Sequence, residues 1–203
     1  MKLYYSPGAC SLATHIVLEW IGRPYQVHKV SISPEKSAEL IKVNPMGAVP
    51  VIEDNGWVLT QNAAILNYLA DSNPASGLGG DGTPRGRAEV NRWVGFVNSD
   101  MHPTFKALFG STAYLADANM VQRTKQEARA QLRRQFELMS RQLEGRNWIT
   151  GARSVADPYF FVMVRWAKGQ QLDISNLTDL DRFYKRMEVD DGVKRVLERE
   201  TAA

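Results

Sequence analysis

One stretch decides the fold: Leu3-Tyr4-Tyr5-Ser6-Pro7-Gly8-Ala9-Cys10-Ser11-Leu12-Ala13. It predicts a short strand that ends at the Pro7-Gly8 turn and is followed by a helix beginning near Cys10. Cys10 is the only cysteine of the chain. At a helix N-terminus, unpaired backbone N–H groups and the helix dipole favour a thiolate, so we expect a lowered pKa for this thiol. The pattern fits a reactive thiol and also a half-buried small apolar side chain.

The composition limits the classes of function. The chain has 203 residues, of which 44% are hydrophobic, as in a globular protein with one large or two small domains. Its 25 basic and 22 acidic residues give a net charge of +3 and form no basic block, which argues against nucleic acid as a partner. No apolar run approaches the roughly 18 residues of a membrane span, and Met1-Lys2 leads directly into a strand. We therefore expect a cytoplasmic protein without membrane contact.

The cysteine and histidine content limits redox and metal chemistry. One cysteine cannot form an internal disulfide, so a redox partner of Cys10 would be a small thiol or another chain. The histidines His15, His28 and His102 do not stand at ligand spacing, so we expect no metal site.

Strand and helix signals alternate after the first helix, which is expected to end at Gly22-Arg23-Pro24. Residues 25–32 predict a strand, and Ser33-Pro34 predicts the start of a short helix that ends before Asn44-Pro45. Residues 47–52 predict a further strand. Its Pro50 is compatible with a trans bond at a sheet edge or with a cis bond, and the residues alone favour trans.

A hairpin and a capped helix complete this part of the chain. Asp54-Asn55-Gly56 predicts a tight turn into the strand 57–59. Gln61-Asn62 then provides polar caps for a helix. The resulting order βαβαββα is typical of a small α/β sheet with helices on both faces.

The second part of the chain carries only helical signals. We expect a first domain at 1–78, a linker rich in Gly and Pro at 79–86, and an all-α domain at 87–203. Within the helical domain, Pro103 should interrupt a helix predicted over 87–109. Ser154 and Asp157 form a variant capping box before a largely apolar helix.

Four signals follow one another along the chain: the Cys10 turn, Asn44-Pro45-x-Gly47-x-Val49-Pro50, Gln61-Asn62 and Gly151-x-x-Ser154-x-x-Asp157. This ordered set resembles the cytosolic glutathione transferases over almost the whole chain, and Tyr5-x-x-x-x-Cys10-Ser11-Leu12 looks like their bacterial beta class. The resemblance implies a thioredoxin-like N-terminal domain that binds glutathione, an all-α C-terminal bundle that supplies most of the pocket for a small hydrophobic electrophile, and a homodimer.

The resemblance also implies roles for individual residues. The bond before Pro50 would be cis, with the Val49 backbone pairing with the cysteinyl part of glutathione like an added strand. Gln61 and Asn62 would hold the γ-glutamyl carboxylate at a helix N-terminus, and Asp100 would address the γ-glutamyl amine from across the dimer. Further glutathione contacts are implied for Lys36, at the glycyl carboxylate, and for Ser99 and His102. Gly95 departs from the family pattern, which often has an asparagine there.

Conjugation needs a glutathione thiolate, so donors must be aimed at its sulfur. The candidates are Tyr5, Cys10, Ser11 and His102. For Tyr5 a core position and for Ser11 a purely capping role are the alternatives. The electrophile pocket would be lined by aromatic residues, which could equally form a core stripe: Phe105, Phe109, Tyr114 and Trp166.

Two other functions stay open at this stage. A mixed disulfide between Cys10 and glutathione would support thiol–disulfide exchange like that of a glutaredoxin. A member of the fold could also bind or regulate without catalysis, because function belongs to the site and not to the fold.

Overall fold

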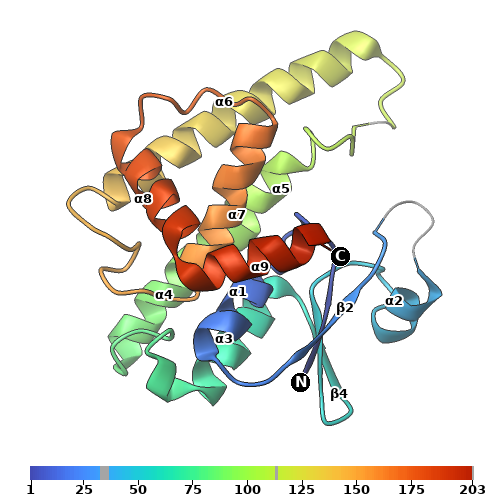
Figure 1. Ribbon diagram of the computed structural model, residues 1–203. Coiled ribbons are helices and arrows are strands. Elements are labelled where there is room, and N and C mark those ends of the chain that lie inside the picture. Colours follow the sequence, from blue (N-terminus) through green and yellow to red (C-terminus); the bar gives the residue numbers. More distant parts are fainter. Residues whose placement is uncertain (33–36, 113, 203) are drawn as a thin grey trace.

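A four-stranded mixed sheet organises the N-terminal part of the protein in a computed structural model that describes residues 1–32, 37–112 and 114–202 (Figure 1). The strands lie in the order β2-β1-β3-β4. The β1 and β2 strands are parallel, whereas β1 with β3 and β3 with β4 are antiparallel. Their bounds are β1 Lys2–Tyr5, β2 Gln26–Lys29, β3 Val51–Asp54 and β4 Trp57–Thr60.

The two faces of the sheet are covered by different helices. Leu3 pairs with Ile52, and both side chains are fully buried in the main core beneath α1 (Ser11–Ile21) and α3 (Asn62–Ser72). Tyr4 and Val51 point to the opposite face, where they join Leu40 of α2 (Ala38–Val43) in a smaller core. This alternation along the strands produces the predicted sheet with helices on both faces.

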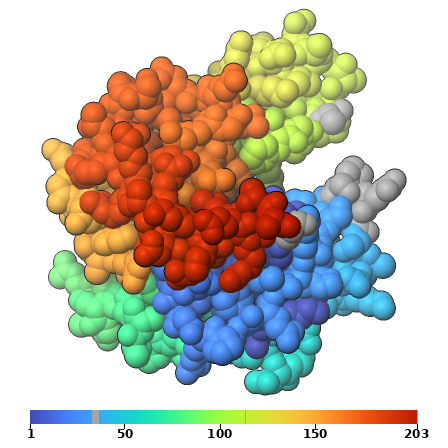
Figure 2. All heavy atoms as spheres, in the orientation of Figure 1, coloured from blue at the N-terminus to red at the C-terminus, as the bar shows by residue number. Residues whose placement is uncertain are grey.

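The rest of the chain is helical. After a short 3₁₀ turn, η1 (Pro74–Ser76), helices α4 to α9 form a bundle beside the sheet, and α1 packs against both α7 and α9. Figure 2 shows α9, in red, lying across the N-terminal part, in blue. In the described residues no helix is both long and apolar enough to cross a membrane. The bounds are α4 Pro84–Phe96, η2 Val97–Met101, α5 His102–Phe105, α6 Ala118–Gln142, α7 Ala156–Gly169, α8 Thr178–Val189 and α9 Asp191–Ala202.

The architecture confirms the thioredoxin-like sheet followed by an all-α part, with local differences. The Val49–Pro50 bond is cis, as the resemblance implied, and Pro50 precedes β3 instead of lying within it. The α2 helix begins at Ala38, with Ser37 accepting a hydrogen bond from the Leu40 amide at 3.3 Å. The expected start at Ser33-Pro34 lies outside the described residues.

The helix expected over 87–109 is longer at its start and divided. It begins at Pro84, inside the expected linker, because the Thr83 hydroxyl accepts a hydrogen bond from the Gly86 amide at 3.0 Å and proline fits the first helical turn. It then passes through the π-helical turn η2 before α5, in which Pro103 stands in the first turn. This turn contains Asn98, which faces the cavity between the sheet and the helical part.

Asp157 forms the predicted capping box and anchors the start of α7. Its carboxylate accepts hydrogen bonds from the Ile149 amide at 2.9 Å, the Ser154 amide at 2.7 Å and the Ser154 hydroxyl at 3.0 Å. The Asp157 side chain is completely buried. Two backbone amides of the loop before α7 therefore have this one carboxylate as their acceptor.

We predict that Asp157→Ala lowers the free energy of unfolding by about 3 kcal/mol, because it leaves two buried amides without acceptors. Urea denaturation followed by circular dichroism would measure the change. Asp191→Ala is the matched control, since that side chain is 85% exposed; its change should stay within about 0.5 kcal/mol. A loss at Asp157 no larger than that of the control would contradict the anchoring role.

Candidate functional site

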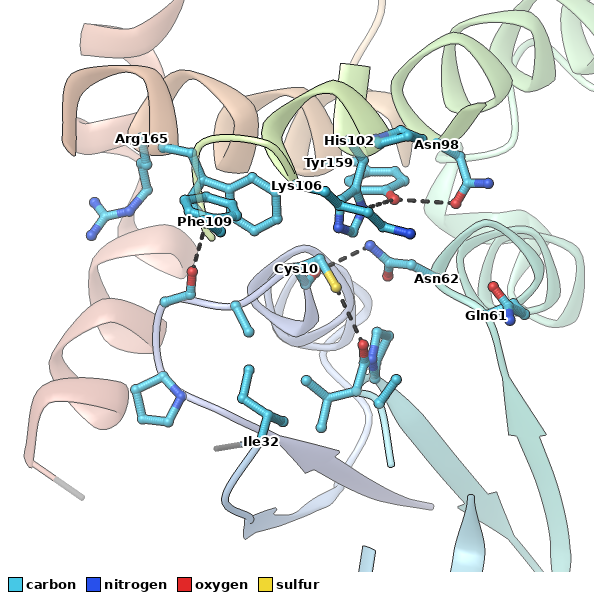
Figure 3. A pocket seen from close by; sticks show the side chains of 18 of the residues that line it. Cys10, Ile32, Gln61, Asn62, Asn98, His102, Lys106, Phe109, Tyr159 and Arg165 are labelled. Carbon is cyan, nitrogen blue, oxygen red and sulfur yellow. Dashed lines mark hydrogen bonds between the residues drawn. The ribbon is translucent and has the colours of Figure 1, made fainter. Parts of the chain in front are cut away.

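One cavity of about 1020 Å³ lies between the sheet and the helical part. Its walls come from the Cys10 turn, the segment around Val49, the start of α3, and the helices α5 and α7 (Figure 3). The resemblance implied that the first three of these elements meet, and all three line this cavity.

Cys10 lies at the centre of this cavity, at the start of α1 (Figure 3). Its thiol donates a hydrogen bond to the Val49 carbonyl, with the sulfur and oxygen 3.2 Å apart. Burial raises the pKa of the thiol to about 12, although the amides of Cys10 and Ser11 act in the opposite direction. The expected lowering of this pKa is therefore wrong for the unliganded protein: desolvation of the thiolate outweighs the N–H groups of the helix start.

The Asn62 side chain stabilises the Cys10 turn through hydrogen bonds. Its side-chain amide donates to the Cys10 carbonyl at 3.1 Å, and its oxygen accepts from the Thr14 hydroxyl at 2.8 Å. The predicted capping role for this side chain is thus replaced by a link between α1 and α3, which is possible because Asn62 is buried.

The start of α3 faces the cavity without a side-chain cap. Gln61 occupies the N-cap position, makes no capping hydrogen bond, and has a φ of 74°, which is unusual for a residue other than glycine. Strained backbone of this kind concentrates at ligand sites. The N–H groups of the first turn are consequently available to an anion.

Tyr5 and Ser11 do not line the cavity, although both were candidates for contact with the sulfur. The Ser11 hydroxyl donates to the Ser6 carbonyl and accepts from the Ser6 amide, each at 3.2 Å, so it closes the turn before α1. Tyr5 is 1% exposed and packs its ring against that of His15. Strand alternation and the helix register direct both side chains into the protein interior.

His102, in contrast, lines the cavity and lies above Cys10 in Figure 3. Its Nδ1 is 2.9 Å from the Tyr159 hydroxyl, which donates to the amide oxygen of Asn98 at 3.1 Å. A hydroxyl has one hydrogen, and Asn98 presents an oxygen that can only accept. The hydrogen between His102 and Tyr159 therefore belongs to Nδ1, which leaves Nε2 of the neutral ring unprotonated.

The surroundings of His102 keep the ring neutral. Burial, and next the positive charge of Lys106, lower its pKa to about 4. The ring also packs edge-on against Trp166, with centroids 5.0 Å apart. At neutral pH the Nε2 atom is thus a hydrogen-bond acceptor and not a donor.

Two of the four aromatic residues assigned to the electrophile pocket, Phe109 and Trp166, line the cavity. Phe105 is fully buried beneath them, with its ring stacked on Phe109, and Tyr114 is 82% exposed and lies outside the cavity. Helical spacing shows that aromatic residues share one face of a helix. It does not show whether that face lies against the core, the cavity or solvent.

The remaining candidates lie in different places. Val49, Pro50 and Gln61 line the cavity. Ser99 and Asp100 are exposed and lie outside the cavity of this single chain. Lys36 lies outside the described residues. Among the cavity residues that were not predicted from the sequence as site residues are four with polar or charged side chains that the mechanism and the substrate proposal use: Asn98, Lys106, Tyr159 and Arg165. Asn98 and Lys106 stand four residues before and after His102. On a helix this spacing places the three side chains on one face, so the sequence did contain a signal for these two residues.

Comparisons with known proteins agree with this geometry. Residues 1–71 match the family model described as glutathione S-transferase, N-terminal domain. The chain is 51% identical, over 98% of each sequence, to glutathione S-transferase GST-4.5 of Xanthomonas campestris.

Solved structures give the same result over the full length. The glutathione S-transferase of Xylella fastidiosa has a TM-score of 0.95 and 48% identity, covering 98% of each chain. A sphingomonad enzyme complexed with glutathione has a TM-score of 0.88 and 33% identity, covering 100% of each chain. The bacterial beta-class enzyme of Sphingomonas chungbukensis has a TM-score of 0.87 and 31% identity, also covering 100% of each. The chain therefore belongs to the glutathione S-transferase family of enzymes.

Proposed function

We propose that this protein binds glutathione in the cavity and joins its sulfur to small hydrophobic electrophiles. The observation that carries the proposal is the hydrogen-bonded chain from Asn98 through the Tyr159 hydroxyl to Nδ1 of His102, in the same cavity as Cys10 and the Val49 backbone. The family membership and the sphingomonad structure, which is complexed with glutathione, support the choice of thiol.

Described residues of the cavity suit two parts of glutathione. The cysteinyl backbone pairs with Val49, whose carbonyl accepts the Cys10 thiol in the unliganded protein. The γ-glutamyl carboxylate lies at the uncapped start of α3, beside Gln61 and Asn62. Lys36 is assigned to the glycyl carboxylate. A volume of about 1020 Å³ reaches the upper end of the usual range for ligand pockets, about 300–1,000 Å³, and leaves room for a second substrate.

His102 accepts the thiol proton during the reaction. As the sulfur attacks, its S–H bond breaks and the proton passes to Nε2, while Tyr159 and Asn98 hold the ring through Nδ1. The free imidazole has a low pKa, and the developing thiolate increases its affinity for the proton because the two charges attract. The new carbon–sulfur bond forms as the leaving group departs with its electron pair.

In this mechanism Cys10 lines the cavity and donates a hydrogen bond, and it does not act as the nucleophile. Forming a mixed disulfide with glutathione disulfide requires a Cys10 thiolate, and a pKa of about 12 leaves that form scarce at neutral pH. Conjugation through glutathione's own sulfur is therefore our first assignment. Thiol–disulfide exchange through Cys10 is the second, because the sulfur lines the cavity.

The proposal also covers the domains, the oligomeric state and the cellular compartment. We assign glutathione to residues 1–78 and the electrophile mainly to 87–203; the segment 79–86 joins them, and its last three residues begin α4. Ser99 and Asp100 are exposed outside their own cavity, which leaves them available to glutathione bound by the partner in a homodimer. We place the activity in the cytoplasm, where glutathione is kept reduced.

We predict that Tyr159→Phe lowers kcat/KM by about tenfold and leaves KM for glutathione nearly unchanged, because Nδ1 then has no partner that fixes its proton. Steady-state kinetics with 1-chloro-2,4-dinitrobenzene would show this. Tyr25→Phe is the control, since the Tyr25 hydroxyl bonds Glu19 and Arg199 far from the cavity. Equal rates for Tyr159→Phe and the wild type would remove the hydroxyl from the mechanism.

We predict that Cys10 of the unliganded protein reacts with iodoacetamide at neutral pH at least about a hundredfold more slowly than free cysteine, because the raised pKa leaves little thiolate. The rate should keep rising with pH up to the limit of stability. Intact-mass spectrometry gives a clean measurement because the chain has one cysteine. The control is the same protein unfolded in guanidinium chloride. A rate in the folded protein that matches or exceeds this control would favour thiol–disulfide exchange.

A further inference from the structure

The charged side chains along the cavity are all of one sign. Among the described residues that line it, Lys106 and Arg165 carry charge and no carboxylate is present. Lys106 lies close to His102, whose pKa it lowers, and so belongs to the reacting centre. Arg165, on α7, lines the cavity and lies at the end opposite Gln61 in the view of Figure 3.

The Arg165 guanidinium has N–H groups that are available to a ligand. Its guanidinium lies 5.7 Å from the centroid of the Phe161 ring and interacts with the Tyr184 hydroxyl. It forms no ion pair with any residue that the structure describes. A guanidinium presents five N–H groups in a planar fork suited to a carboxylate. One contact with a hydroxyl leaves most of that fork available.

The glutathione carboxylates do not need this arginine. In the proposed binding mode one carboxylate lies at the start of α3 and the other is assigned to Lys36. Arg165 lies beyond the sulfur position, on the far side of Cys10 from Gln61 (Figure 3). Its positive charge therefore falls within the space left for the second substrate.

Two aromatic side chains, Phe109 and Trp166, line the same cavity as Arg165. Phe109 is 50% exposed and meets Trp166 edge-on, with the centroids 5.0 Å apart and the planes at 90°. The Trp166 indole N–H donates to the Gly8 carbonyl at 2.9 Å, which fixes the ring against the Cys10 turn. A flat, partly exposed aromatic side chain offers a stacking surface for another ring.

We propose that the preferred second substrate is an aromatic electrophile with an anionic group, whose ring packs on Phe109 and Trp166 while its anion binds Arg165. This inference rests on the proposed conjugating function and specifies its substrate class. Arg165 is a residue that determines specificity, and the chemistry at the sulfur stays with His102.

A matched pair of substrates tests the charge alone. In both 4-chloro-3-nitrobenzoate and 4-chloro-3-nitrobenzamide, the glutathione sulfur attacks the carbon that bears chlorine. A carbon–sulfur bond forms, chloride leaves with the bonding electron pair, and the thiol proton passes through His102 to solvent. The two compounds have similar size and shape, and each enzymatic rate is divided by the rate with free glutathione to remove the difference in intrinsic reactivity.

We expect kcat/KM, corrected in this way, to favour the benzoate, and the benzoate-to-benzamide ratio to fall by about tenfold in Arg165→Gln. The control is Lys168→Gln, which removes the same charge from the same helix. Lys168 is exposed, lies over the Tyr184 ring at 4.4 Å and does not line the cavity, so its ratio should match the wild type. An unchanged ratio in Arg165→Gln, or an equal loss with both compounds, would overturn the assignment.

A binding experiment separates this inference from the proposed function. Calorimetric titration of the unreactive 3-nitrobenzoate and 3-nitrobenzamide, with S-methylglutathione present, reports on the site without turnover. Tighter binding of the benzoate that is lost in Arg165→Gln supports the anionic subsite even if no conjugation is observed, a result that would defeat only the proposed reaction. Equal binding of the two compounds to the wild type overturns the subsite.

Discussion

The burial of α1 is the constraint on which the rest of the structure depends. Every residue from Ser11 to Leu18 is buried, because the helix lies between the sheet and α3 on one side and α7 and α9 on the other. Its first turn cannot move without disturbing both halves of the protein. Asn62 adds a direct link by bonding the Cys10 carbonyl and the Thr14 side chain. The sulfur of Cys10 is thus held at a fixed place between the Val49 backbone and the side chains of the helical part that line the cavity.

This arrangement divides the chemistry between the two halves. The N-terminal part supplies backbone groups, at Val49 and at the start of α3, which suit a peptide-like ligand. The helical part supplies side chains: a neutral imidazole fixed by Tyr159 and Asn98, an aromatic wall, and two cations. The low dielectric that raises the pKa of Cys10 also lowers that of His102, so both groups are uncharged before a ligand arrives.

Local patterns predicted much of the fold. The order of strands and helices along the chain, the turn before Cys10 and the box at Asp157 all depend on residues close in sequence, and the structure confirms them. The errors arose where distant parts meet. The pKa of Cys10 depends on what buries it, and Tyr159 of α7 hydrogen-bonds Asn98 of the π-helical turn η2, 61 positions away in the sequence. For Tyr5 the structure fits the alternative of a core position, and Ser11 is buried as well. Periodicity places residues on one face of an element but does not identify the element that the face contacts.

The most direct test concerns the proton on His102, since the assignment of the catalytic base depends on it. Nitrogen-15 NMR of the imidazole rings, with His102 identified by comparison with His102→Gln, would report the protonation state of each ring nitrogen at neutral pH. We expect a neutral ring with hydrogen on Nδ1 and none on Nε2. A hydrogen on Nε2, or a doubly protonated ring, would contradict the role of His102 as proton acceptor.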